Sequence, residues 1–341
     1  MDSKTLYKYL AKCITAFYFV KVGSLLLFYF VTHPFVQLVK DRPTPPKCLT
    51  DPKHGEHRYA VVNGIKLHYV EKGDRSKPLL LFVHGFPEFW YSWRYQLQEF
   101  SKDYWCIAID KRGYGDSEKP RDKAEYKLNN VVNDIKELVI SLGREKFTLI
   151  GHDWGAVVTF RFVDLYGSML DQFVALSGPS GDVWAKLVFS EWWQFSHAWY
   201  VFFFQNCCLP EISVKMGDLD VFKKAMATPE KSGPRNVTDD DVEAYKYTFG
   251  KKYALTPPLN YYRANFLDSS ITRQPKTEVT TRGLFILGEK DDYISRSSIE
   301  PLKKRFPAIQ TVILKDARHF IQQEEPEEVN KLIREFLKKG N

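Results

Sequence analysis

The feature that most restricts the fold of this 341-residue chain is a series of short, almost wholly apolar runs. These runs are LLLFVHG (79–85), WCIAID (105–110), FTLIG (147–151), FVALSG (173–178), RGLFILG (282–288) and TVILK (311–315). Continuous apolarity over so few residues is typical of strands that are covered on both faces, as in a parallel sheet. Amphipathic segments such as residues 131–143 alternate with the runs, and this alternation predicts an α/β sheet.

Two further elements extend this pattern at its ends. RYAVVNGIKLHYVEKG (58–73) contains two alternating segments around Asn63-Gly64, which predicts a β-hairpin ahead of the first apolar run. Pro326 begins a final amphipathic helix whose first residues are acidic and whose last residues are basic. That charge order suits the helix dipole, so we expect the chain to close with a helix.

The alternation stops once, near Gly181. Residues 181–270 carry no clear strand signals and are rich in tryptophan, tyrosine and phenylalanine at helix-compatible spacings. The economical arrangement is an α/β core made of residues 58–180 and 271–341, with residues 181–270 inserted as a helical cap.

The N-terminal segment differs in kind from the rest. Residues 13–31, CITAFYFVKVGSLLLFYFV, contain a single charge, Lys21. As a helix, this run spans roughly 28 Å, close to the hydrocarbon thickness of a bilayer. We therefore expect residues 1–39 to form a single-pass membrane anchor, the alternatives being a cleaved signal peptide or a buried core helix. Residues 40–57 hold four prolines and many charges, which predicts an extended linker.

Composition and charge exclude several classes of function. The formal net charge of +7 comes without long lysine or arginine blocks inside the folded region. It argues weakly for an anionic membrane surface and hardly at all for nucleic acid. The sparse cysteines indicate neither a disulfide framework nor a metal site, because they lack zinc-binding spacing. They are Cys13, Cys48, Cys106, Cys207 and Cys208.

The candidate chemistry centres on GHDWGA, residues 151–156. An apolar strand, a sharp turn and a helix, with small residues around a reactive one, form the layout of a nucleophile elbow. Gly151 and Gly155 remove side chains that would clash where strand and helix meet. The elbow centre is Asp153 rather than serine, and the helix that begins at Trp154 favours its ionised form by about 0.3–1 kcal/mol. The alternative is that Asp153 is an ordinary N-cap residue with no catalytic role.

Two later loops carry the partners that a nucleophile needs. LGEKDD places Asp291 after one apolar run, and DARHF places His319 after the last one. Nucleophile, acid and histidine follow one another in this order in α/β-hydrolase triads. The order predicts a triad of Asp153, Asp291 and His319.

HGFP, which follows the run 79–83, predicts an oxyanion hole. In this layout the loop supplies one backbone donor, and the residue after the nucleophile supplies another. We expect the N–H groups of Phe86 and Trp154 to fill these roles, with His84, Gly85 and Pro87 shaping the loop.

Together HGFP, RGYGDS, GHDWGA, GEKD and DARHF resemble the epoxide hydrolases of the α/β-hydrolase fold. The likeness covers residues 58–338, and the apolar N-terminal segment is similar to that of the membrane-anchored epoxide hydrolase 3 and 4 type. The resemblance implies two cap tyrosines that hold the epoxide oxygen. PLNYYR (258–263) places one at Tyr262 rather than Tyr261, and YVFFFQ (200–205) places the other at Tyr200. The resemblance also implies that the protein is located in the endoplasmic reticulum.

These residues predict the hydrolysis of a lipophilic epoxide to a diol. A carboxylate is suited to displacing a carbon–oxygen bond from behind, which would leave an ester on Asp153. The tyrosines would protonate the alkoxide, and His319, oriented by Asp291, would activate water. This chemistry requires no metal, organic cofactor or obligate protein partner.

Two rival functions share much of this pattern. A haloalkane dehalogenase also uses an aspartate nucleophile with a histidine and an acid, but it needs N–H donors around a halide rather than tyrosine hydroxyls. NYYR, and Phe86 in place of an amide side chain, favour the epoxide. A catalytically inactive α/β-hydrolase acting as a binding protein would be expected to lack a triad member, whereas all candidates are present.

Overall fold

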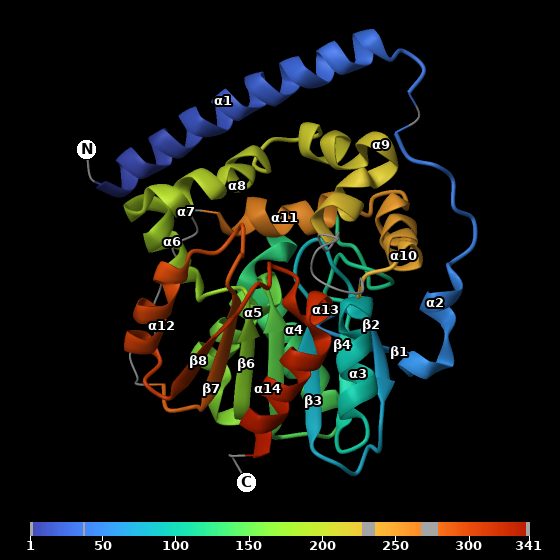
Figure 1. Ribbon diagram of the computed structural model, residues 1–341, viewed down its shortest axis with the longest axis vertical. Coiled ribbons are helices and arrows are strands. Elements are labelled where there is room, and N and C mark those ends of the chain that lie inside the picture. The colour runs from blue at the N-terminus through green and yellow to red at the C-terminus, as the bar shows by residue number, and fades with distance from the viewer. Residues whose placement is uncertain (1–2, 37, 227–235, 267–278, 339–341) are drawn as a thin grey trace.

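The computed structural model of the protein describes residues 3–36, 38–226, 236–266 and 279–338 (Figure 1). Its centre is an eight-stranded sheet with the strand order β1-β2-β4-β3-β5-β6-β7-β8. The strands are β1 (Glu56–Val62), β2 (Ile65–Lys72), β3 (Leu79–Val83), β4 (Trp105–Ile109), β5 (Phe147–His152), β6 (Leu170–Leu176), β7 (Gly283–Gly288) and β8 (Ile309–Leu314). The β1–β2 and β2–β4 pairs are antiparallel and the other pairs are parallel.

The burial of the strands explains why the apolar runs identify them. Every residue of β3, β4, β5 and β7 is buried, as expected for parallel strands covered on both faces. Most of β1 is exposed, because it is an edge strand. The covering helices are α3 (Arg94–Phe100), α4 (Leu128–Ser141), α5 (Trp154–Tyr166), α12 (Ile299–Arg305), α13 (Ile321–Glu324) and α14 (Pro326–Lys338). The α/β core expected from the alternation is confirmed.

A helical cap is inserted between β6 and β7 and lies over one end of the sheet (Figure 1). Its helices are α6 (Gly181–Ser190), α7 (Trp192–His197), α8 (Trp199–Phe203), α9 (Leu209–Met226), α10 (Asp239–Gly250) and α11 (Thr256–Asn265). Within the described part of this insertion, 181–226 and 236–266, there is no strand. Aromatic and aliphatic side chains of α8 and α11 pack into a core of their own that includes Phe202, Phe203 and Leu259.

The segment expected to be an extended linker is more ordered than its prolines indicate. It contains α2 (Lys47–Thr50) and a 3-10 turn (Pro52–His54), and β1 already begins at Glu56. Its first part is held to the cap by Arg42, whose guanidinium pairs with Asp218 at 2.6 Å and Glu243 at 3.0 Å. These long-range ion pairs cannot be read from the local sequence.

The N-terminal helix α1 (Ser3–Thr32) runs across the outer side of the cap, where it contacts α8 and α9 (Figure 1). One stripe of α1, including Ala11 and Leu26, is buried. Most of its other apolar side chains are exposed, and Phe28 is 70% exposed. Tyr9–Thr32, with a mean hydropathy of 1.8, is long and apolar enough to cross a membrane.

Candidate active site

Asp153 occupies the tight turn between β5 and α5, as the elbow motif predicts. Its φ of 52° and ψ of −117° lie in a region that non-glycine residues rarely adopt. A Cβ atom on Gly155 would collide with the carbonyl oxygen of Val83, and one on Gly151 would collide with the carbonyl oxygen of Gly155. The two glycines therefore let strand and helix approach closely enough to form the strained turn.

A backbone N–H group holds one oxygen of the Asp153 carboxylate. Phe86, in the loop after β3, donates its N–H to Asp153 Oδ1 at 2.8 Å. The backbone N–H of Trp154, at the start of α5, helps to lower the pKa of this carboxylate. Since β3 and β5 are neighbouring parallel strands, the loop and the elbow both lie at the carboxyl ends of the strands and meet there. This is the arrangement expected of an oxyanion hole.

The other oxygen of Asp153 faces the predicted base. His319 Nε2 lies 3.6 Å from Asp153 Oδ2, and His319 Nδ1 lies 2.9 Å from Asp291 Oδ2. Asp291 is fixed in turn, because its Oδ1 accepts the backbone N–H groups of Tyr293 at 2.8 Å and Ile294 at 3.0 Å. The structure thus brings together three residues from the loops after β5, β7 and β8.

Asp153 and His319 each stabilise the charged form of the other. Burial alone would raise the pKa of Asp153, but His319, with smaller contributions from His152 and the backbone of Trp154, outweighs this effect and lowers that pKa below its usual range. Burial alone would lower the pKa of His319, but Asp291 and then Asp153 raise it well above 6.5. In the free protein, these directions favour an ionised Asp153 and a protonated His319.

Two cap tyrosines lie close enough to Asp153 to feel its charge. Tyr262, on α11, packs its ring edge-on against Trp154 with 5.1 Å between ring centroids, and Tyr200, on α8, lies 6.0 Å from Tyr262 by the same measure. Burial, and next the charge of Asp153, raise the pKa of both phenols well above 10. The neighbouring Tyr261 is engaged elsewhere, because its hydroxyl donates to the carbonyl of Arg112 at 2.8 Å.

Comparison with known proteins decides the family. Residues 78–326 match the family model of the alpha/beta hydrolase fold. The chain is 38% identical to epoxide hydrolase 4 of Homo sapiens (87% of this chain, 83% of that protein) and 38% identical to epoxide hydrolase 3 of Xenopus tropicalis (87% and 82%). It also superimposes on the crystal structure of an epoxide hydrolase from Vigna radiata with a TM-score of 0.75 at 33% identity, covering 85% of this chain and 99% of that one.

The chain belongs to the epoxide hydrolases of the α/β-hydrolase fold. This confirms the resemblance drawn from the motifs, and with it the enzyme class.

Sequence reasoning missed one buried carboxylate in this epoxide hydrolase. Glu88 accepts the N–H of Gly85 at 2.8 Å, His152 Nδ1 lies 2.7 Å from it, and its other oxygen accepts the amides of Gln322 and Gln323. His152 Nε2 lies 2.9 Å from the carbonyl oxygen of His319. Glu88 therefore ties the HGFP loop to the elbow and to the loop of the base.

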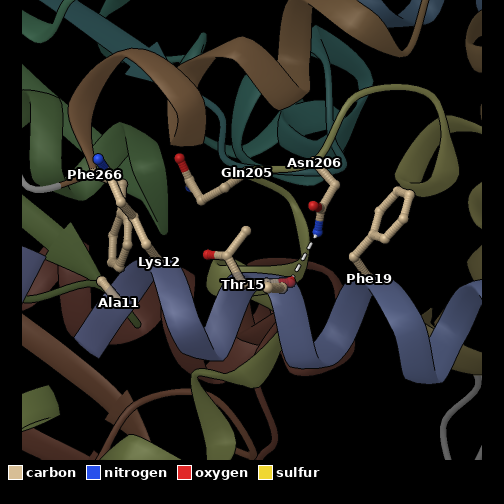
Figure 2. A pocket seen from close by; sticks show the side chains of 8 residues that line it. Ala11, Lys12, Thr15, Phe19, Gln205, Asn206 and Phe266 are labelled. Carbon is tan, nitrogen blue, oxygen red and sulfur yellow. Dashed lines mark hydrogen bonds between the residues drawn. The ribbon is translucent and has the colours of Figure 1, made fainter. Parts of the chain in front are cut away.

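A cavity of about 510 Å³ lies between α1 and the cap, apart from this site (Figure 2). Its lining residues include none of the triad or the two cap tyrosines; they are Ala11, Lys12, Thr15, Ala16, Phe19, Gln205, Asn206 and Phe266. Two of its lining residues contact Tyr262: the Gln205 amide donates to the backbone carbonyl of Tyr262 at 3.3 Å, and the backbone N–H of Phe266 donates to the same carbonyl at 2.9 Å. The chemistry is therefore assigned to the cluster around Asp153 and not to this cavity.

Proposed function

We propose that this protein hydrolyses lipophilic epoxides to vicinal diols through an ester formed on Asp153. The observation that carries the proposal is the different environment of the two carboxylate oxygens. Oδ1 accepts the N–H of Phe86, whereas Oδ2 lies beside His319 Nε2. One oxygen is thus held where an oxyanion would form, and the other is placed for attack.

In the first step, Asp153 Oδ2 attacks one ring carbon of the epoxide from behind, and the carbon–oxygen bond on the far side breaks. The electron pair of that bond stays on the ring oxygen, which becomes an alkoxide. Tyr200 or Tyr262 transfers a proton to it, so that the alcohol forms as the ring opens. Both phenols are neutral before this step, because burial and the charge of Asp153 raise their pKa.

In the second step, His319 removes a proton from water. Ester formation has by then removed the charge of Asp153, one of the charges that raise the pKa of His319. The imidazolium therefore gives its proton, through water, to the tyrosinate left by the first step, and the neutral imidazole can act as a base. The resulting hydroxide attacks the carbonyl carbon of the ester. Phe86 and Trp154 would hold the oxyanion on Oδ1 until the Cγ–Oδ2 bond of the ester breaks. Oδ2 leaves with the substrate as an alkoxide, which takes the proton that His319 removed from water, and the diol departs. The new Asp153 carboxyl group returns a proton to His319, which restores the starting state.

The His319→Gln variant tests this sequence. Without the base, the ester should accumulate, so incubation with an aryl epoxide should increase the intact protein mass by one substrate molecule. The matched control is His319→Gln combined with Asp153→Ala, which should show no adduct. Normal turnover by His319→Gln would show that the base is assigned wrongly.

A chlorinated alkane offered to the wild-type protein separates this proposal from haloalkane dehalogenase activity. The pair Tyr200 and Tyr262 presents hydroxyl donors to a ring oxygen, and Phe86 supplies no amide side chain for a halide. We therefore expect no halide release. Release at a rate comparable to epoxide turnover would favour the dehalogenase.

The same proposal places the enzyme on a membrane. The apolar helix α1, mostly exposed over Tyr9–Thr32, would serve as a single-pass anchor. The endoplasmic reticulum is the compartment that the resemblance implies.

A further inference from the structure

Lys111 is a buried cation that the proposed reaction does not use. It follows Asp110 at the end of β4 and is 1% exposed. Its ammonium makes no ion pair within the described ranges and instead donates to the backbone carbonyl of His84. The rings of Tyr114 and Tyr261 lie 4.9 Å and 5.3 Å from it. Burying a lysine with so few partners is costly, so this position calls for an explanation.

Lys111 holds His84 from two sides. Its backbone N–H donates to His84 Nε2 at 3.2 Å, while its ammonium binds the carbonyl of the same residue. Since Nε2 is an acceptor here, the ring proton must sit on His84 Nδ1, which lies 2.8 Å from the carbonyl oxygen of Gly85. Both carbonyls that precede Phe86 are thereby fixed.

We propose that Lys111 is a positioning residue for the oxyanion hole: it fixes the peptide groups of His84 and Gly85, so that the Phe86 N–H stays aimed at Asp153 Oδ1. The inference rests on the proposed ester mechanism, in which that N–H stabilises the oxyanion of the second step. Lys111 acts through His84 and touches neither substrate nor nucleophile. Its positive charge, behind the hole, also favours the negative charge that forms there.

The surroundings of Lys111 make this charge sensitive to pH. Burial lowers the pKa of its ammonium to about 7, against the opposing influence of Asp153, Glu88 and Asp110. In the ester the Asp153 charge is gone, so the pKa of the ammonium lies lower still. As the pH rises through that lower value, the ammonium loses its proton and the support for the oxyanion weakens. The titratable groups around it are Asp110 and Tyr114 on its own loop, His84 and Glu88 on the HGFP loop, Asp153 at the elbow, and Tyr261 on α11.

Single-turnover kinetics of the full chain with an aryl epoxide test the proposal in the variants Lys111→Met and Lys111→Arg. Methionine keeps the length and removes the charge, so the hydrolysis of the ester should slow about tenfold while ester formation changes less than about threefold. Ester formation removes the Asp153 charge that raises the pKa of the ammonium, so the wild-type hydrolysis rate should fall as the pH rises through a value below about 7. Lys111→Met should lack this limb, and Lys111→Arg should shift it to higher pH. The exposed Lys303→Met serves as the matched control and should behave as wild type.

Stability provides a second measurement. Because the lowered pKa means that burial opposes the charged form, Lys111→Met should melt at a higher temperature than wild type at pH 7. Slower hydrolysis in a more stable protein supports a positioning role. Equal slowing of both steps with lower stability, or unchanged hydrolysis and pH dependence, overturns it. Failure to trap any ester in His319→Gln would instead overturn the underlying mechanism.

Discussion

Each candidate residue of the site has a distinct physical task because its surroundings differ. The Asp153 carboxylate is held by a backbone donor on one side and faces His319 on the other. Its charge raises the pKa of His319 in the free protein and, together with the larger effect of burial, raises the pKa of the cap phenols Tyr200 and Tyr262. The loss of that charge on ester formation would change the state of all three partners at once, which links the first step to the second.

Tyr262→Phe tests the proton donor. Ring opening should slow by roughly 10²-fold, because the alkoxide would lose a positioned acid, and stopped-flow measurement of ester formation follows this step directly. The matched control is Tyr261→Phe, which removes a hydroxyl bound to the Arg112 carbonyl. It should cost about 1 kcal/mol of stability with little effect on ring opening. A slow Tyr261→Phe beside a normal Tyr262→Phe would reverse the assignment.

The titration of His319 tests the coupling within the triad. A histidine with a raised pKa stabilises the fold below about 6.5, and this contribution is lost as the pH rises through the raised value. Asp153→Asn removes a neighbouring charge that raises the pKa, so His319 should lose its proton at a lower pH than in wild type. Imidazole proton resonances measured by NMR across a pH series give both values. Identical values would show that Asp153 and His319 do not interact.

Motifs identified residues that lie next to each other in the sequence, but not the residues that tertiary contacts bring together. HGFP, GHDWGA and DARHF were sufficient to place Phe86, Asp153 and His319 at one site. Glu88 and Lys111 adjoin two of the motifs, yet nothing local shows that one binds His152 or that the other holds His84. Their roles depend on the loops that follow different strands, and these loops meet at the carboxyl ends of the strands.

At the scale of elements, the turn that holds Asp153 can form only because β5, α5 and β3 approach one another closely. Gly155→Ala would push a methyl group into the Val83 carbonyl, which belongs to the backbone of β3 and cannot move away easily. We expect a loss of about 1–3 kcal/mol or more in the free energy of unfolding, together with loss of activity. Urea denaturation followed by circular dichroism measures this.

A glycine with more space provides the control for that variant. The nearest neighbour of a Cβ on Gly167 is the side-chain hydroxyl of Thr281, at 3.1 Å, which can rotate away. Gly167→Ala should therefore cost much less stability than Gly155→Ala. Equal costs would show that elbow packing is not specially tight.

The core strands and the cap differed in how far they could be predicted. Apolar runs revealed the parallel strands because both faces of those strands are buried. The cap gave only a helical signal, and the positions of Tyr200 and Tyr262 came from the resemblance, since their convergence depends on how α8 and α11 pack. The order within residues 40–57 was missed for a similar reason, because Arg42 finds its partners on the cap.

At the scale of the whole molecule, α1 and the cap form one side of the protein and the sheet forms the other (Figure 1). If α1 is an anchor, the full chain should stay in the membrane pellet after alkaline carbonate extraction. Leu25→Lys with Phe28→Lys places two charges on exposed apolar positions of α1 and should release the protein, since each charge costs about 2.5–3.5 kcal/mol near the middle of a bilayer. The same positions changed to alanine are the control. Release of the wild-type chain would rule out an anchor.

The central claim is that Asp153 becomes covalently bonded to the substrate and is then freed by water. A single turnover in oxygen-18 water, followed by mass spectrometry of the peptide that contains residue 153, tests it most directly. The account predicts that one labelled oxygen enters the Asp153 carboxylate and that the first diol released is unlabelled. A labelled diol together with an unlabelled Asp153 would contradict it, because water would then have attacked the epoxide itself.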